Sequence, residues 1–228
     1  MKLILDHTTQ EAPDVTSFYF KSETPITWRA GQFLVYTLPH PNEDDRKDQR
    51  YFTIASPPDT KMPMITTRFT DPKGSTFKSA LHALSQGDTI EAKGPDGEFV
   101  LDDPAQPSIF IAGGIGVTPY HSILLDLDHR GLPINVTLLY ANRTEDAVYR
   151  KELEALSAKH PEFKIHYFIG DQRIDEQAIR KIVPDLTVPL FYISGPEPMV
   201  QAFEKMLMGM GIPDAHIKRD YFPGYNWP

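Results

Sequence analysis

The chain has 228 residues, which is enough for two modest domains that each bury a core of their own. Its formal net charge of −8 argues against nucleic-acid binding, and the absence of cysteine excludes disulfides and an iron–sulfur cluster held by cysteines of this chain. The N-terminal apolar run is too short for a signal peptide, and no stretch approaches the ~18 apolar residues of a membrane span, so we expect a cytoplasmic protein.

The first hundred residues contain short runs rich in β-branched and aromatic residues, which is typical of strands. Glycine and proline separate these runs, as in the turns of antiparallel sheets. One helical pattern, from about Ser75 to Leu84, interrupts them, and the polar segment from Pro39 to Gln49 is expected to be a long exposed loop. We predict a small antiparallel β-barrel over residues 1–103. Its expected strands are 15–20, 33–38, 50–55, 64–70, 89–92 and 98–101.

Residues 102–107 have the composition of a linker, and after them the periodicity changes. Strand-like runs now alternate with helical patterns, which predicts an α/β domain with a doubly wound parallel sheet over residues 104–228. Ligands of such sheets bind at the carboxyl ends of the strands. The expected strands are 109–112, 134–140, 163–168, 190–193 and 217–222.

The first of these strands runs into three glycines, Gly113, Gly114 and Gly116. Glycines there let the backbone turn sharply and approach a pyrophosphate without a Cβ in the way. Thr118 is a suitable N-cap for the next helix, and Pro119 suits its first position. Because Pro119 stands where the G-x-G-x-x-G pattern has its last glycine, a plain glycine turn between strand and helix stays open as an alternative.

A barrel followed by a nucleotide-type domain, with four motifs in order, resembles the ferredoxin–NADP reductase family of flavoproteins. Arg50-Tyr51-Phe52-Thr53 is similar to the family's flavin motif R-x-[YF]-[ST], and Gly74-Ser75-Thr76-Phe77 is similar to the loop and helix start at the flavin pyrophosphate. The glycine loop that ends in Thr118-Pro119 is the third motif. Ser194-Gly195-Pro196-Glu197-Pro198-Met199 is similar to [CS]-G-P-x-x-M at the nicotinamide.

The resemblance implies that FAD binds at the first two motifs, and the residue types suit it. Arg50 offers a fixed fork of donors to the pyrophosphate, Phe52 an aromatic face to the isoalloxazine, and Thr53 a hydroxyl for flavin N5. On a strand Thr53 points away from the other two, so we expect it to act partly through its backbone. A plain strand with an exposed Arg, and an ordinary N-cap before the helix, are the alternatives. The remaining expected flavin contacts are Tyr51, Gly74, Ser75 and Thr76.

At the nicotinamide, the resemblance implies contacts from Gly195, Pro196 and Met199. Ser194 stands where many relatives have Cys, and it keeps the small size and a hydroxyl donor. Together with Thr53 it is expected near the reacting atoms. The reaction needs no protein nucleophile, because the flavin carries the redox chemistry.

The second parallel strand is expected to end near Arg143. In many dinucleotide domains an acid there binds the ribose 2′-hydroxyl, whereas an Arg accepts a 2′-phosphate. Arg143 therefore favours NADPH over NADH. The alternative is a solvent-exposed Arg that Glu145 and Asp146 neutralise.

The last eight residues, 221–228, contain four aromatic side chains, although chain termini usually carry polar residues. Relatives often end with an aromatic at the flavin. The resemblance therefore implies that Tyr225, or else Trp227, covers the isoalloxazine and moves aside for hydride transfer. Simple aromatic packing is the alternative.

Together these features indicate a flavin-dependent NAD(P)H oxidoreductase, a stand-alone reductase without an iron–sulfur domain. The expected cofactors are FAD and NADPH or NADH, and the expected acceptor is an electron carrier such as ferredoxin or flavodoxin. A reductase component of an oxygenase and a non-enzymatic flavin- or nucleotide-binding regulator are the alternatives. The eight histidines show no metal-ligand spacing, so no metal site is expected.

Overall fold

The computed structural model describes residues 1–69 and 75–222, and its contacts divide the chain into two compact units. Unit 1 comprises Met1–Val100 together with His121–Asp126, and unit 2 comprises Leu101–Tyr120 and Leu127–Pro228. The sequence predicts a boundary after residue 103 but gives no signal that a later helical segment belongs to unit 1. In the described part of the chain, no helix combines the length and apolar character that a membrane crossing requires.

The returning helical segment is tied to unit 1 by two buried hydrogen bonds. The ring of His121 contacts the carbonyl oxygen of Ala55 through Nδ1 at 2.6 Å. The hydroxyl of Ser122 donates to the carbonyl of Ser56 at 2.7 Å. The two carbonyls lie two and three residues beyond a barrel strand that ends at Thr53, so this segment satisfies backbone acceptors that the sheet itself does not reach.

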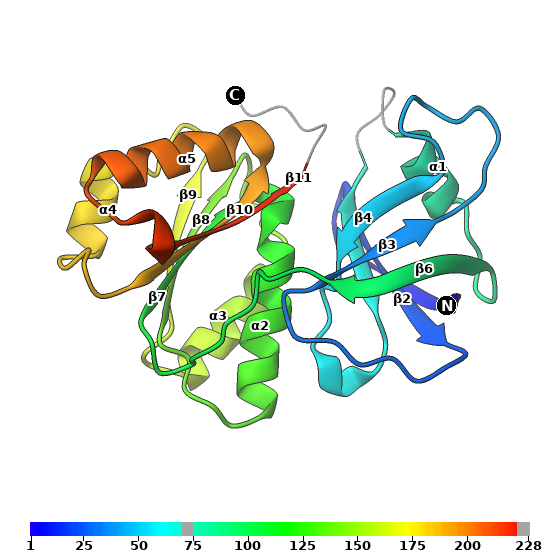
Figure 1. Ribbon diagram of the computed structural model, residues 1–228, viewed down its shortest axis with the longest axis horizontal. Helices are drawn as coiled ribbons and strands as arrows, with labels where there is room; N and C mark the ends of the chain where they lie inside the picture. The colour runs from blue at the N-terminus through cyan, green and yellow to red at the C-terminus, as the bar shows by residue number, and fades with distance from the viewer. Residues whose placement is uncertain (70–74, 223–228) are drawn as a thin grey trace. The chain divides into compact units, whose positions relative to one another are not determined.

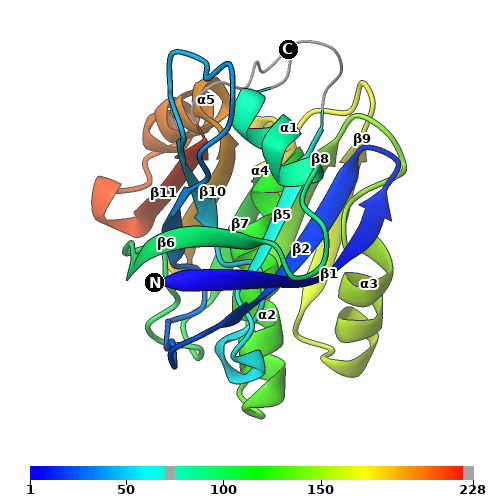
Figure 2. The same ribbon diagram turned by 90° about the vertical axis from the view of Figure 1, so that its right-hand side faces the viewer.

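Unit 1 is built on a six-stranded antiparallel sheet with one helix (Figures 1 and 2). Its elements are β1 (Lys2–Ala12), β2 (Val15–Ser22), β3 (Phe33–Thr37), β4 (Gln49–Thr53), β5 (Met64–Arg68), α1 (Thr76–His82) and β6 (Thr89–Asp96). The strand order is β4-β3-β6-β1-β2-β5. Just beyond β4, Ala55 N donates to Met64 O of β5 at 2.9 Å, so the two edges meet and the barrel nearly closes. The predicted antiparallel barrel is confirmed.

The strands expected for unit 1 differ from the observed strands in two places. Strand β1 was not predicted, because its exposed segment from His7 to Gln10 breaks the alternation of buried and exposed residues. Residues 98–101 were predicted as a strand but form none. Phe99 and Val100 are buried, so their apolar character serves packing rather than strand pairing. Strand β6 instead continues to Asp96, which pairs with Phe33 of β3.

Unit 2 alternates strands and helices, as the sequence predicts. Its elements are β7 (Ser108–Gly113), α2 (Thr118–His129), β8 (Val136–Asn142), α3 (Arg150–Lys159), β9 (Lys164–Ile169), α4 (Glu176–Ile182), β10 (Leu190–Pro196), α5 (Glu197–Gly209) and β11 (Ile217–Phe222). The five strands form a parallel sheet in the order β11-β10-β7-β8-β9. Helix α3 begins at Arg150, directly after Tyr149, which adopts a left-handed φ of 61°.

The helices of unit 2 cover both faces of the sheet (Figure 1). Successive side chains of a strand point to opposite faces. In β7, Ile109 and Ile111 therefore join the core beneath α4 and α5. Between them, Phe110 points the other way and stacks on Tyr120 of α2, with ring centroids 4.4 Å apart. The predicted doubly wound sheet is confirmed, and its chain order reverses between β7 and β10.

Candidate functional site

The carboxyl ends of β7 and β10 lie side by side at the point where the strand order reverses. Open α/β sheets bind their ligands in the crevice at such a switch point. Strand β7 ends at Gly113, and β10 ends with Ser194, Gly195 and Pro196. The structure therefore brings together two motifs that are widely separated in the sequence.

Gly116 is needed for this close approach of backbones. A Cβ at this position would lie 2.2 Å from the carbonyl oxygen of Ser194, well inside van der Waals contact. Gly195 is less constrained, because the nearest atom to a Cβ there would be Sδ of the flexible Met199 at 2.9 Å. Met199 itself is buried in the core beneath the sheet, so its contact with a ligand stays a prediction.

Gly114 marks an open turn. Its φ of +53° is left-handed, and the closest atom to a Cβ built there would be Oδ1 of Asn142 at 3.9 Å. The next residues form one short 3-10 turn before α2 begins at Thr118. The hydroxyl of Thr118 donates to Ile115 O at 3.1 Å, so this residue closes the turn from inside the helix rather than standing before it as a cap. Pro119 follows as the second helical residue.

Asn142, at the carboxyl end of β8, was missed by the sequence reasoning. Its Nδ2 donates to Thr144 O at 2.8 Å, while its Oδ1 is buried and has no hydrogen-bond partner among the described residues. A buried acceptor without a donor is unfavourable, and a ligand hydroxyl would satisfy it. This acceptor beside the open turn at Gly114 fits the ribose of a nucleotide. An amide near a strand end reads as a turn residue in sequence, which is why no signal pointed to it.

Ser194 is fully buried and donates its hydroxyl to Oδ2 of Asp220 at 3.0 Å. The two residues are register partners in β10 and β11. Burial raises the pKa of the Asp220 carboxyl to about 6, and the hydrogen bond from Ser194 opposes this rise. Burial, and secondarily the charge of Asp220, raise the pKa of Tyr120 as well. Asp220 was not predicted, although an acid at the carboxyl end of the last parallel strand was a usable signal.

Arg143 is exposed just beyond the end of β8. Glu145, one of the two acids expected to neutralise it, instead binds Arg150 with an Nη1–Oε2 distance of 2.5 Å. Arg150 also pairs with Glu154 through Nε at 2.9 Å. This arrangement weakens the alternative in which Glu145 holds Arg143.

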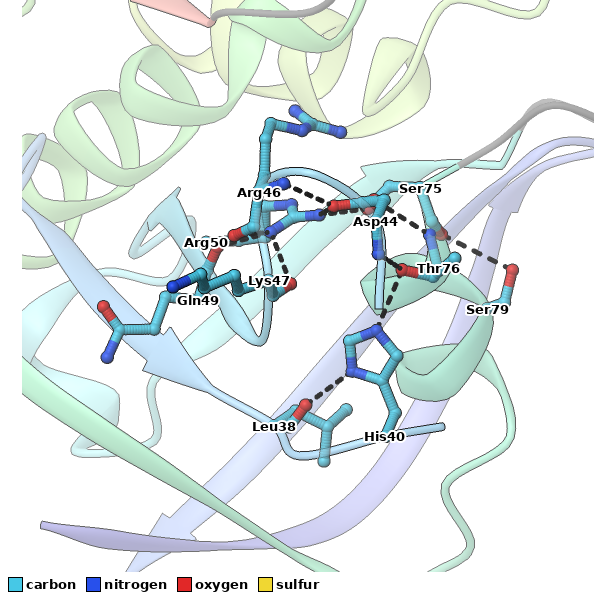
Figure 3. A network of polar contacts seen from close by, with 10 residues as sticks. All are labelled: Leu38, His40, Asp44, Arg46, Lys47, Gln49, Arg50, Ser75, Thr76 and Ser79. Atoms are coloured by element: carbon cyan, nitrogen blue, oxygen red, sulfur yellow. Dashed lines mark hydrogen bonds and ion pairs between the residues drawn. The ribbon is translucent and has the colours of Figure 1, made fainter. Parts of the chain in front are cut away.

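In unit 1, Arg50 of β4 is buried, with 8% of its surface exposed (Figure 3). Its Nη2 contacts both carboxylate oxygens of Asp44, at 2.6 and 2.7 Å, and the hydroxyl of Ser75 at 3.0 Å. Its Nη1 donates to the carbonyls of Arg46, Lys47 and Gln49 at 2.9, 3.0 and 2.6 Å. The expected alternative of an exposed Arg on a plain strand is therefore wrong.

The loop before β4 is exposed at most positions, as predicted, but it is anchored through Asp44. Thr76 N donates to Oδ2 of Asp44 at 3.3 Å, and the Thr76 hydroxyl accepts from Asp44 N at 3.1 Å. Partial burial alone would raise the pKa of Asp44, but hydrogen bonds, led by that from Arg50, outweigh it and hold the pKa at about 2. The Asp44 carboxylate lies at Arg50 where the oxygens of another anion could bind. The residues around this carboxylate therefore fit a phosphate group. Acidic residues in a mixed-charge loop gave no sequence signal for this role.

The two aromatic rings of β4 differ in exposure. Phe52 packs against Tyr36 and Phe77, with ring centroids 5.9 Å away in each case, so it belongs to the edge of the barrel core. Tyr51 points to the opposite face and is 65% exposed. Thr53 is buried. The more accessible aromatic surface for a ligand is thus Tyr51. Predicted site residues Gly74 and Tyr225, with the alternative Trp227, lie outside the described residues.

Comparison with known proteins supports a function for both units. Residues 2–101 match the oxidoreductase FAD-binding domain, and residues 110–205 match the oxidoreductase NAD-binding domain. The chain is 32% identical to ferredoxin–NADP reductase B of Sorangium cellulosum, and the match covers 83% of both chains. The chain belongs to the ferredoxin–NADP reductase family. The predicted family is therefore confirmed, and FAD and a nicotinamide nucleotide are the cofactors of its two domains.

Two further similar proteins show the range of proteins that share these two domains. The reductase component DmpP of phenol 2-monooxygenase from Pseudomonas sp. is 30% identical over 86% of this chain and 58% of its own length. The flavohem-like FAD/NAD-binding domain of nitric oxide dioxygenase from Vibrio cholerae has the same fold, with a TM-score of 0.83 over 97% of this chain and 98% of that one at 20% identity. The chain spans only 58% to 61% of three curated relatives, which are reductases of monooxygenase systems.

Proposed function

We propose that this ferredoxin–NADP reductase relative is an NAD(P)H oxidoreductase that delivers electrons from a nicotinamide nucleotide, through FAD, to a separate acceptor. The supporting observation is the meeting of the glycine turn and the Ser194 segment at the switch point of the parallel sheet. The open turn at Gly114, a buried acceptor and a hydroxyl–carboxyl pair gather there. A switch point with these groups suits a dinucleotide better than a macromolecule.

In this proposal each residue has a limited task, because bound FAD supplies the redox chemistry. Arg50 balances the charge of a pyrophosphate. Gly114 leaves room for close approach of a second one, and Asn142 accepts a hydrogen bond from ribose. Asp220 fixes the direction of the Ser194 hydroxyl. Thr53, Ser194 and Tyr225 remain our candidates for contact with the reacting atoms.

We infer NADPH as the preferred nucleotide, because Arg143 is exposed at the strand end where a 2′-phosphate is commonly recognised. For the acceptor, we propose an electron carrier such as ferredoxin or flavodoxin. This is supported by the relative matched over most of its length, which is named a ferredoxin–NADP reductase. An oxygenase component is the second candidate, favoured by the match to DmpP. A cytoplasmic location stays a prediction.

The decisive experiment is stopped-flow reduction of the flavin-loaded protein by NADPH and, separately, by NADH. We expect rapid bleaching of the flavin band, faster at equal concentration with NADPH, followed by turnover on an artificial one-electron acceptor. A flavin that binds but is reduced by neither nucleotide would favour the non-enzymatic regulator. Turnover with purified ferredoxin, flavodoxin and an oxygenase component, compared side by side, ranks the acceptors.

A further inference from the structure

The two Nη groups of Arg50 donate to acceptors of the protein itself. An Arg side chain offers five N–H donors. Those of Nη1 are shared by the carbonyls of Arg46, Lys47 and Gln49, and those of Nη2 by Asp44 and Ser75. Nε is buried and has no hydrogen-bond partner among the described residues. A pyrophosphate therefore finds no Nη proton free in this arrangement.

The carboxylate of Asp44 takes the place at Arg50 that a phosphate would take. Carboxylate and phosphate oxygens are alternative partners for the same guanidinium fork. Asp44 also receives hydrogen bonds from the backbone N–H groups of Arg46, at 3.0 Å, and Thr76, at 3.3 Å (Figure 3). The Asp44 oxygens thus contact both the positive charge of Arg50 and the backbone N–H donors that an anionic ligand needs.

We propose that Asp44 is an internal competitor for the flavin pyrophosphate, holding Arg50 in the flavin-free protein and leaving it when FAD binds. This inference rests on the proposed flavin site. The two anions exclude each other for a simple reason: both need the protons of Nη2, and sharing them would place like charges within hydrogen-bond distance.

The loop that carries Asp44 is suited to release it. Residues on both sides of Asp44 are exposed, so the loop has little packing to lose. Lys47 adopts a left-handed φ of 57°, which is unfavourable for a residue with a Cβ. Two contacts hold it there: its N–H donates to Asp44 O at 2.9 Å, and its carbonyl accepts from Arg50. Departure of Asp44 allows the backbone at Lys47 to relax.

The first test compares FAD affinity in two neighbouring variants. Asp44→Asn keeps the shape but removes the competing charge, whereas Asp45→Asn removes the same charge from an exposed neighbour in the same loop. Flavin is stripped from the full-length proteins, and FAD binding is measured by titration calorimetry. We expect Asp44→Asn to bind FAD roughly tenfold to hundredfold more tightly, the size of one charge-assisted contact, and Asp45→Asn to match the wild type. Equal or weaker binding by Asp44→Asn overturns the proposal.

The second test uses the unaltered protein. Hydrogen exchange of backbone amides normally slows where a ligand binds. If FAD displaces Asp44, the amides of Arg46 and Lys47 lose their acceptors and exchange faster in the flavin-loaded protein. Unchanged or slower exchange at these two amides also overturns the proposal.

A third variant separates failure of this inference from failure of the flavin site itself. Arg50→Ala removes the cation for which both anions compete. If Arg50→Ala weakens FAD binding while Asp44→Asn does not strengthen it, the flavin site stands and only the competition is refuted. If Arg50→Ala, folded by circular dichroism, keeps wild-type FAD affinity, both proposals fall.

Discussion

The surroundings of Arg50 in unit 1 and the switch point of the parallel sheet in unit 2 differ in how their polar groups are satisfied. Around Arg50, the protein's own side chains and carbonyls occupy every Nη donor. At the switch point of the parallel sheet, Gly114 leaves open space and the buried Oδ1 of Asn142 has no partner among the described residues. The first place is thus satisfied within the protein, whereas the second keeps a buried acceptor that the described residues do not satisfy.

The largest effect is expected from a substitution where the glycine turn approaches the backbone of β10 most closely. Gly116→Val places a side chain where even a Cβ lies 2.2 Å from the Ser194 carbonyl, so β7 and β10 must separate. We expect loss of NADPH binding and destabilisation of unit 2 by about 1–3 kcal/mol or more, the cost of overpacking. NADPH titration and thermal unfolding measure both.

Gly114→Ala is the milder companion variant, because its surroundings within the protein are open and only the positive φ of 53° opposes it. This variant should lose about 1–2 kcal/mol from backbone strain while still binding NADPH measurably. If Gly114→Ala binds NADPH as tightly as the wild type, the nucleotide does not approach this turn and the placement of the site is refuted. In both variants, FAD should stay bound.

The next largest effect comes from removing the cation at Arg50. Arg50→Ala should weaken FAD binding by roughly tenfold to hundredfold, because at least one charge-assisted contact to the pyrophosphate is lost. Arg46→Ala is the control: its side chain is exposed, and only its backbone contributes to the cluster. Flavin retention after gel filtration gives the measurement, and equal retention by the two variants would contradict the placement of the flavin.

A smaller effect on nucleotide binding is expected from Arg143, beyond the carboxyl end of β8. Arg143→Ala should reduce the preference for NADPH over NADH by about tenfold, the worth of one contact to a 2′-phosphate. The ratio of kcat/KM values for the two nucleotides is the readout, with Arg130→Ala, which lies beyond the carboxyl end of α2, as a charge-matched control. A ratio that does not move removes Arg143 from the site.

The effect on ligand binding is expected to be smallest at Asp220, where the readout is instead the pH dependence of stability. Because the folded-state pKa of Asp220 is raised to about 6, the folded protein holds a proton that the unfolded chain releases near pH 4. Stability therefore falls as the pH rises from about 4 to 6, and the loss is complete above that window. Asp220→Asn cannot ionise, so it should be up to about 3 kcal/mol more stable than the wild type at pH 8 and no more stable at pH 4. Urea unfolding at both pH values tests this, and an identical difference at both would refute it.

The fold could be predicted because its strands and helices have strong sequence patterns. The residues that act through tertiary contacts could not be predicted in this way. Residues Ile109 to Ala112 are all apolar, which predicted a buried strand, and the glycines after them predicted a tight turn. Strand β1 was missed because its exposed second half shows no alternation. Asp44 and Asp220 were missed for a different reason: their roles arise from partners, Arg50 and Ser194, that only the folded chain brings within hydrogen-bond distance.

The segment of α2 that belongs to unit 1, His121–Asp126, affects how the two domains of such proteins can be exchanged between relatives. His121 and Ser122 form hydrogen bonds with the carbonyls of Ala55 and Ser56, although they follow the apparent linker in the sequence. A chimera joined at residue 103 would inherit these two side chains from the foreign nucleotide domain. Exchange between relatives should therefore succeed where the incoming helix carries equivalent donors, and a crossover after α2 is safer than one at the linker.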